Sequence, residues 1–91
     1  MYHAKRQAIF DLSTILRAQG RTMSFEELLM WLNRNGFTGD DGRPYQHPRG
    51  AASAVRAAYH YVANELGLGD VGAASVAEAF TNASGDYAYE T

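Results

Sequence analysis

The chain has 91 residues, 46% hydrophobic and 20% charged, which is enough for one small globular domain spanning residues 1–91. No apolar run approaches the roughly 20 residues that a membrane-spanning helix needs, so we expect no membrane partner. Cysteine is absent, which excludes disulfides and thiolate metal sites and fits the reducing environment of the cytoplasm.

The formal net charge is −2, but the charges are unevenly distributed along the chain. Residues 1–64 carry all eight basic and five of the acidic side chains, a net charge of +3, whereas residues 65–91 carry five acidic and no basic ones. This asymmetry predicts a basic working face and an acidic end turned away from it.

A first helix is expected over residues 4–19, with Leu12 and Leu16 on its apolar face and Gly20 as its C-terminal stop. Phe10 lies off that face, close to opposite Leu12. An exposed aromatic at this position is what a helix-mediated homodimer would use, and the predicted interface consists of Phe10, Thr14 and Arg17.

A second helix is expected over residues 24–35. Ser24 and Glu27 have the spacing of a capping box, in which the serine hydroxyl accepts from the backbone N–H three residues later. Asn35 and Gly36 supply an exit from the helix. Its buried face is predicted to hold three large side chains, Leu28, Trp31 and Leu32.

After a loop rich in turn-forming residues, a third helix is expected over residues 48–66, with Pro48 at its first position. Val55, Val62 and Leu66 lie on its apolar arc. The opposite arc bears a polar stripe whose members are separated by alanines. The stripe consists of Arg49, Ser53, Arg56 and His60.

Two alternating runs around a Gly-containing loop predict a β-hairpin near residues 75–90, with Phe80 in the core. A short helix over residues 71–80 is the competing interpretation, because this segment is rich in alanine.

Three helices followed by a hairpin give a mainly α fold with a small β-hairpin, an order that resembles a winged helix-turn-helix domain. The segments Leu32-Asn33-Arg34-Asn35-Gly36 and Gly42-Arg43-Pro44-Tyr45, followed by Val55, are also similar to the helix-turn-helix segment of large serine recombinases. The chain has no catalytic serine domain of that family. The resemblance implies DNA binding through the third helix and a small phage or mobile-element protein.

The polar stripe and the preceding loop are therefore predicted to read duplex DNA as part of a transcriptional regulator. Arginine can fork onto guanine or phosphate, and alanine allows a close approach of the backbone. The predicted DNA-binding residues are Arg43, Tyr45, His47, Arg49, Ser53, Arg56 and His60.

The alternative is a protein-interaction module, such as a phage-encoded inhibitor of a host defence complex. It would act by surface binding or by nucleic-acid mimicry through acidic residues near the C-terminus, namely Asp70, Glu78, Asp86 and Glu90. An enzyme is not expected, since no nucleophile motif, phosphate loop or metal-ligand spacing is present, and no cofactor or metal is predicted.

Overall fold

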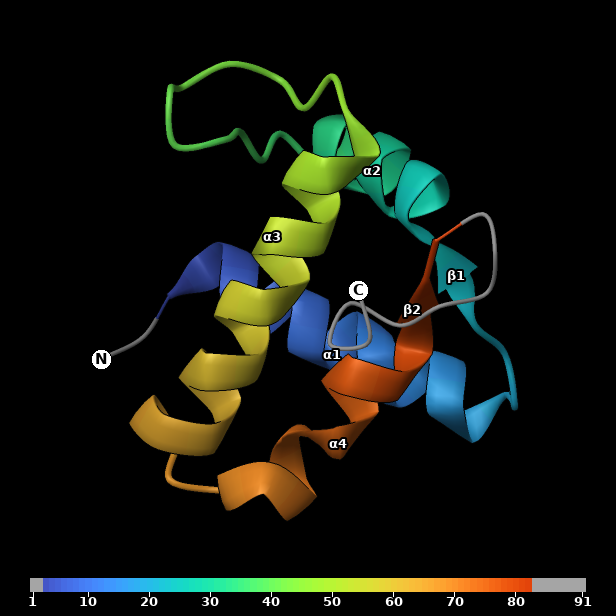
Figure 1. Ribbon diagram of the computed structural model, residues 1–91, viewed down its shortest axis with the longest axis vertical. Coiled ribbons are helices and arrows are strands. Elements are labelled where there is room, and N and C mark those ends of the chain that lie inside the picture. Colours follow the sequence, from blue (N-terminus) through green and yellow to red (C-terminus); the bar gives the residue numbers. More distant parts are fainter. Residues whose placement is uncertain (1–2, 83–91) are drawn as a thin grey trace.

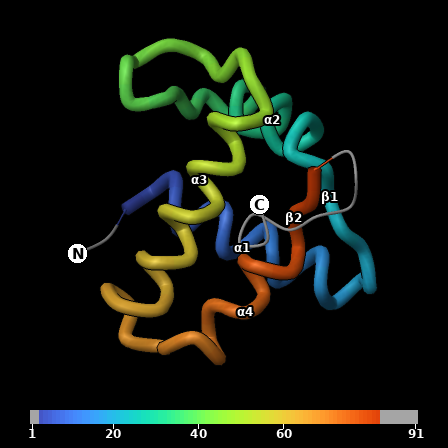
Figure 2. Tube along the Cα trace, viewed as in Figure 1, coloured from blue at the N-terminus to red at the C-terminus, as the bar shows by residue number. Residues whose placement is uncertain are grey.

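The computed structural model describes residues 3–82 and is mainly helical (Figure 1). In chain order, the described elements are α1 (Ala4–Ala18), β1 (Met23–Ser24), α2 (Phe25–Arg34), α3 (Pro48–His60), the π-helical turn η1 (Tyr61–Glu65), α4 (Gly69–Ala79) and β2 (Phe80–Thr81). Helix α3 packs against α1, α2 and α4 (Figure 2). None of the helices within residues 3–82 is long and apolar enough to cross a membrane.

The three predicted helices are confirmed; the first two end close to the expected residues, whereas α3 ends at His60 and is followed by η1. Helix α1 ends at a left-handed Gly20 (φ +65°), where the N–H of Arg21 donates to the carbonyl oxygen of Leu16. At the start of α2, the Ser24 hydroxyl accepts from the N–H of Glu27 at 3.0 Å, as the capping box predicts. The Glu27 carboxylate in turn accepts from the Ser24 hydroxyl at 3.2 Å.

The predicted hairpin is wrong over residues 75–79, which belong to helix α4. Ala73, Val76 and Ala79 recur at helical spacing and are fully buried, so one helix face covers the core. The alternation of side-chain polarity had favoured strands, but the high helix propensity of alanine prevails. The rest of the predicted hairpin, residues 83–90, lies outside the described residues.

Phe80 and Thr81, which were expected in the hairpin, form a short parallel strand pair with β1. Phe80 pairs with Met23, and Thr81 pairs with Ser24, so β2 lies against β1 at the start of α2 (Figure 1). The pair joins the end of α4 to the segment between α1 and α2. Residues separated by almost 60 positions in the sequence are thereby held together.

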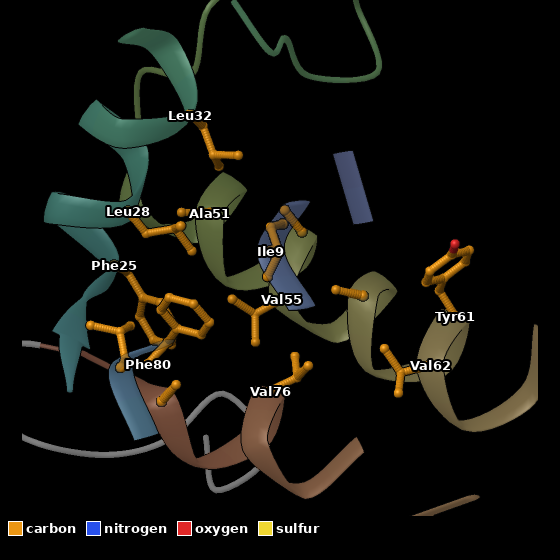
Figure 3. Close-up of a cluster of buried hydrophobic side chains, with 14 of the residues drawn as sticks. Ile9, Phe25, Leu28, Leu32, Ala51, Val55, Tyr61, Val62, Val76 and Phe80 are labelled. Carbon is orange, nitrogen blue, oxygen red and sulfur yellow. The ribbon is translucent and has the colours of Figure 1, made fainter. Parts of the chain in front are cut away.

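The hydrophobic core is formed by α1, α2, α3, η1, α4 and the start of β2 (Figure 3). The predicted core residues that are buried are Leu16, Leu28, Leu32, Val55, Val62 and Phe80. Two others, Leu12 and Trp31, are only half-buried, and Trp31 stacks on Phe37 with ring centres 6.2 Å apart.

The end of the predicted third helix departs from the expected pattern because it is a π-helical turn. A π turn holds more residues than an α turn, which rotates the side chains that follow it relative to α-helical periodicity. Tyr61 is buried, with its hydroxyl donating to Oε1 of Gln7 at 2.9 Å. Leu66, expected on the apolar arc, is 37% exposed.

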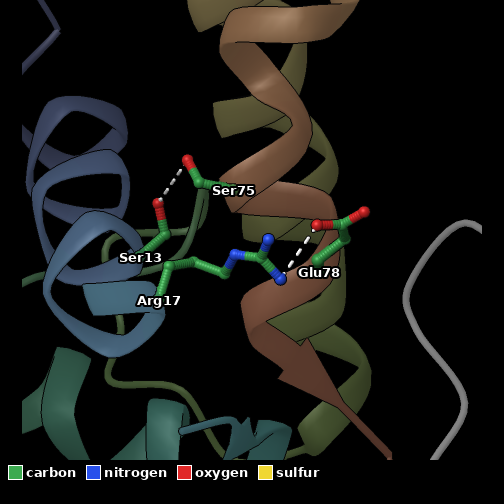
Figure 4. A network of polar contacts seen from close by, with 4 residues as sticks. All are labelled: Ser13, Arg17, Ser75 and Glu78. Carbon is green, nitrogen blue, oxygen red and sulfur yellow. Dashed lines mark hydrogen bonds and ion pairs between the residues drawn. The ribbon is translucent and has the colours of Figure 1, made fainter. Parts of the chain in front are cut away.

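Polar contacts connect α1 to α4 and involve part of the predicted dimer patch (Figure 4). The hydroxyl oxygens of Ser13 and Ser75 lie 3.2 Å apart, and Arg17 forms an ion pair with Glu78 at 2.9 Å. Phe10 is half-buried and packs against the core, so it is not the exposed aromatic that was predicted. Thr14 is exposed and donates to the carbonyl oxygen of Asp11.

Candidate nucleic-acid interface

A groove of about 460 Å³ lies between the start of α1, the loop that precedes α3, and the first half of α3. In Figure 1 the loop is the green segment that leads into α3, and the start of α1 is dark blue. The groove is lined by His3, Lys5 and Arg6, by Gly39, Asp40, Asp41, Arg43, Pro44, Tyr45, Gln46 and His47, and by Arg49, Gly50, Ser53, Ala54 and Ala57.

The loop wall of the groove is fixed to α2 by a reciprocal pair of hydrogen bonds. The side-chain amide of Asn33 donates to the carbonyl oxygen of Tyr45 at 2.9 Å and accepts from the Tyr45 N–H at 2.7 Å. An asparagine that satisfies both backbone groups of one residue acts like a neighbouring strand. The loop therefore enters α3 from a defined position.

Lys5 fixes the same loop to α1. Its ammonium group donates to the carbonyl oxygen of Thr38 at 2.9 Å and to the hydroxyl of Tyr45 at 2.7 Å. The Lys5 nitrogen lies 2.7 Å from the Tyr45 hydroxyl but 5.3 Å from the centre of the ring, which places it beyond the hydroxyl end of the ring. The contact is therefore a hydrogen bond rather than a cation–π interaction. Lys5 thus holds the two walls together.

The Tyr45 ring occupies space that only a glycine at position 50 leaves open. A Cβ atom on Gly50 would lie 2.9 Å from Cδ1 of Tyr45, closer than real side chains approach. Tyr45 is half-buried, and its backbone groups and hydroxyl all have partners. Tyr45 therefore anchors the loop, and its DNA contact stays a prediction.

The charge of the groove is predominantly positive. Four cationic side chains line it, Lys5, Arg6, Arg43 and Arg49, against two carboxylates, Asp40 and Asp41. Within residues 3–82, none of the four cations forms an ion pair with an acidic side chain. Asp41 accepts from the backbone N–H of Arg43 at 3.0 Å, which holds its carboxylate within the loop.

The predicted DNA-binding residues fall into two groups. Five of them line the groove: Arg43, Tyr45, His47, Arg49 and Ser53. The other two, Arg56 and His60, lie further along α3 and outside the lining. At 100° per residue, however, all four members of the polar stripe fall within about 60° of the α3 surface, so the stripe continues from the rim of the groove.

The contribution of α1 to the groove was not foreseen from the sequence. Lys5 and Arg6 are the only adjacent basic pair in the chain and lie in the first turn of a helix that has no acidic residue there. Cations at a helix N-terminus oppose the helix dipole. That unfavourable placement was the available signal of a role other than helix stability.

Among residues 3–82, no group of three or more histidine, aspartate or glutamate side chains is arranged to hold a metal ion. No protein-family model, no curated protein and no solved structure gives a significant match to this chain. The chemistry of the groove is therefore the basis on which a function is assigned.

Proposed function

We propose that the protein binds double-stranded DNA through the groove and the adjoining polar stripe of α3. The observation that carries the proposal is the convergence of cations from three separate segments, represented by Arg6, Arg43 and Arg49, on one groove. A duplex presents a dense array of phosphates, and a basic groove without internal ion pairs is suited to neutralise several of them.

The proposed roles follow from position along α3. Arg43 and Arg49 lie beside the N-terminus of the helix, where charge and helix dipole both favour phosphate. Arg56 and His60 lie further along the stripe and are assigned to base edges. In this proposal the protein is a small cytoplasmic transcriptional regulator that acts by binding rather than by catalysis.

The proposed DNA-binding unit is a variant of the helix-turn-helix, with α2 packed against α3. The connection between them, residues 35–47, is much longer than the usual turn of about three or four residues. Helix α4 and the parallel strand pair occupy the chain positions where the first part of a hairpin wing was expected. DNA contacts are therefore assigned to the groove and not to a wing.

The test is a fluorescence-anisotropy titration of a labelled random-sequence duplex at several salt concentrations. Arg43→Ala and Arg49→Ala should each lower the salt slope of log affinity by about 0.9, because each removes one phosphate contact. Arg21→Ala is the matched control, since Arg21 is exposed and outside the groove. A preferred DNA site is then selected from a random pool. On that site Arg56→Ala should lower the binding free energy by roughly 1–3 kcal/mol, and on random DNA by much less.

Protein interaction is the second candidate, and one observation favours it. Leu66, Leu68 and Val71, which are close in the sequence at the junction of η1 and α4, are 37%, 49% and 92% exposed. Exposed apolar side chains close together are typical of protein contacts. A partner chain that covers these side chains is the form of this candidate that we propose, and light scattering at micromolar concentration of the wild type and of Val71→Asp tests whether that partner is a second copy.

Nucleic-acid mimicry is the less favoured form of that candidate. Glu78 is paired with Arg17, and a carboxylate oxygen of Asp70 accepts from the hydroxyl of Tyr59 at 2.8 Å. These acids already have partners within the molecule. Asp86 and Glu90, the other two residues proposed for mimicry, lie outside the described residues.

A further inference from the structure

The N-termini of α2 and α3 differ in how their backbone N–H groups are satisfied. Helix α2 has the Ser24 cap and acidic residues in its first turn, whereas α3 has neither a side-chain cap nor a first-turn acid. In α3, Pro48 lacks an N–H, the N–H of Gly50 donates to the carbonyl oxygen of His47, and the N–H of Arg49 has no acceptor within residues 3–82. The start of α3 therefore presents an unneutralised positive end.

This positive end lies in the groove together with side-chain cations. Arg43 reaches the groove from the loop, Arg49 from the first turn of α3, and Arg6 from the opposite wall. The helix N-terminus, the three guanidinium groups and the concave surface are independent features, and all of them favour an anion.

His3 adds an unsatisfied polar atom to the same lining. Its Nδ1 is buried and has no hydrogen-bond partner within the described part of the chain.

We propose that the groove is a binding site for one phosphate group, seated at the N-terminus of α3 between Arg43, Arg49 and Arg6. This inference deepens the proposed DNA binding, because a backbone phosphodiester is one source of such a group. A phosphate monoester, such as that of a mononucleotide, is the other source.

The charges and donors of the groove match phosphate. Its four cations exceed the carboxylates of Asp40 and Asp41 by two, which fits a group of one or two negative charges. An arginine guanidinium group can donate two parallel hydrogen bonds to two phosphate oxygens, and the backbone N–H of Arg49 adds a further donor. Lys5 acts as a positioning residue, because its ammonium group already donates hydrogen bonds to Thr38 and Tyr45.

The experiment is a titration of the isotope-labelled protein, followed by amide NMR, with inorganic phosphate, with a mononucleotide and with the duplex, at constant ionic strength. We expect saturable shifts of the amides of residues 49–51. The amides of residues 25–27, at the capped start of α2, are the internal control and should stay unchanged.

Variants test whether the shifts report a built site. Arg49→Gln and Arg43→Gln should weaken the binding of inorganic phosphate by roughly 10- to 100-fold, as expected for loss of a charged hydrogen bond. Arg21→Gln, which lies outside the groove, should have no effect. An amide spectrum with the dispersion of the wild type shows that each variant is folded.

The outcomes separate this inference from the proposed function. Phosphate shifts at residues 49–51, with competition between phosphate and duplex, support both. Phosphate shifts without any duplex binding support the site, with a monoester as its ligand, and overturn the DNA proposal. Duplex binding that Arg49→Gln weakens, without saturable shifts of residues 49–51 on addition of inorganic phosphate, overturns the site alone. Shifts spread evenly over all exposed basic residues overturn it as well.

Discussion

Replacing Asn33 by alanine should destabilise the protein and loosen the loop wall of the groove. The substitution removes both hydrogen bonds to Tyr45, at 2.9 Å and 2.7 Å, and leaves a part-buried backbone N–H and C=O without their partner. A net contribution of about 0.5–1.5 kcal/mol per bond gives a loss of about 1–3 kcal/mol in the free energy of unfolding.

Urea unfolding followed by circular dichroism measures this loss. With a slope of about 2 kcal/mol per molar urea, the midpoint should fall by roughly 0.5–1.5 M. Asn64→Ala is the matched control, because Asn64 is an exposed asparagine whose side chain forms no hydrogen bond to a residue in the described range. Its midpoint should stay within experimental error of the wild type.

The same variant should weaken duplex binding without a large change in salt slope, because the loop moves while every cation is retained. An Asn33→Ala protein as stable as the Asn64→Ala control would refute the reasoning. The loop wall would then be held by something other than the Asn33 pair.

Three further predictions concern packing and electrostatics. Phe80→Ala should cost about 3–5 kcal/mol of stability by urea unfolding, since Phe80 is fully buried; a loss below 1 kcal/mol would contradict the core described here. Gly72→Ala should lower the melting temperature, because the new Cβ would lie 2.3 Å from Cβ of Leu68. Alanine usually stabilises a helix by up to about 1 kcal/mol over glycine, so an unchanged or raised melting temperature counts against that contact. A double-mutant cycle of Arg17→Ala and Glu78→Ala should give a coupling free energy below about 1 kcal/mol that decreases with added salt, because both side chains are about half exposed. A larger coupling free energy that does not depend on salt would show a buried pair.

The helices could be predicted because their signals are local. The Ser24–Glu27 box and the glycine after α1 act within one turn of the chain, and the structure shows both in use. Apolar spacing likewise placed Val55 and Leu32 in the core. Local hydrogen bonding and one-sided burial need no knowledge of the rest of the fold.

The C-terminal part was mispredicted because a short alanine-rich segment carries both periodicities. Val76 and Phe80 satisfy a strand pattern and a helix pattern equally, and burial against α1 and α3 decides between them. The parallel pairing of Phe80 with Met23 depends on contacts between distant segments, for which the sequence has no local signal.

The candidate site was predictable only on the side of α3. Arg49 and Ser53 could be assigned to one helix face from their spacing alone, and the structure places both in the groove. Lys5 and Arg6 join them only because α1 packs beside α3. The anchoring role of Tyr45 depends on Gly50 and Asn33, whose proximity also arises from the tertiary fold.

The salt dependence of duplex binding by the double variant Arg43→Ala, Arg49→Ala tests the assignment of the groove as a DNA interface most directly. The wild type should bind random duplex at low salt, and the double variant should bind more weakly with a slope of log affinity against log salt shallower by about 1.8. A wild type that binds no duplex at low salt, or a double variant with the affinity and slope of the wild type, would contradict the assignment.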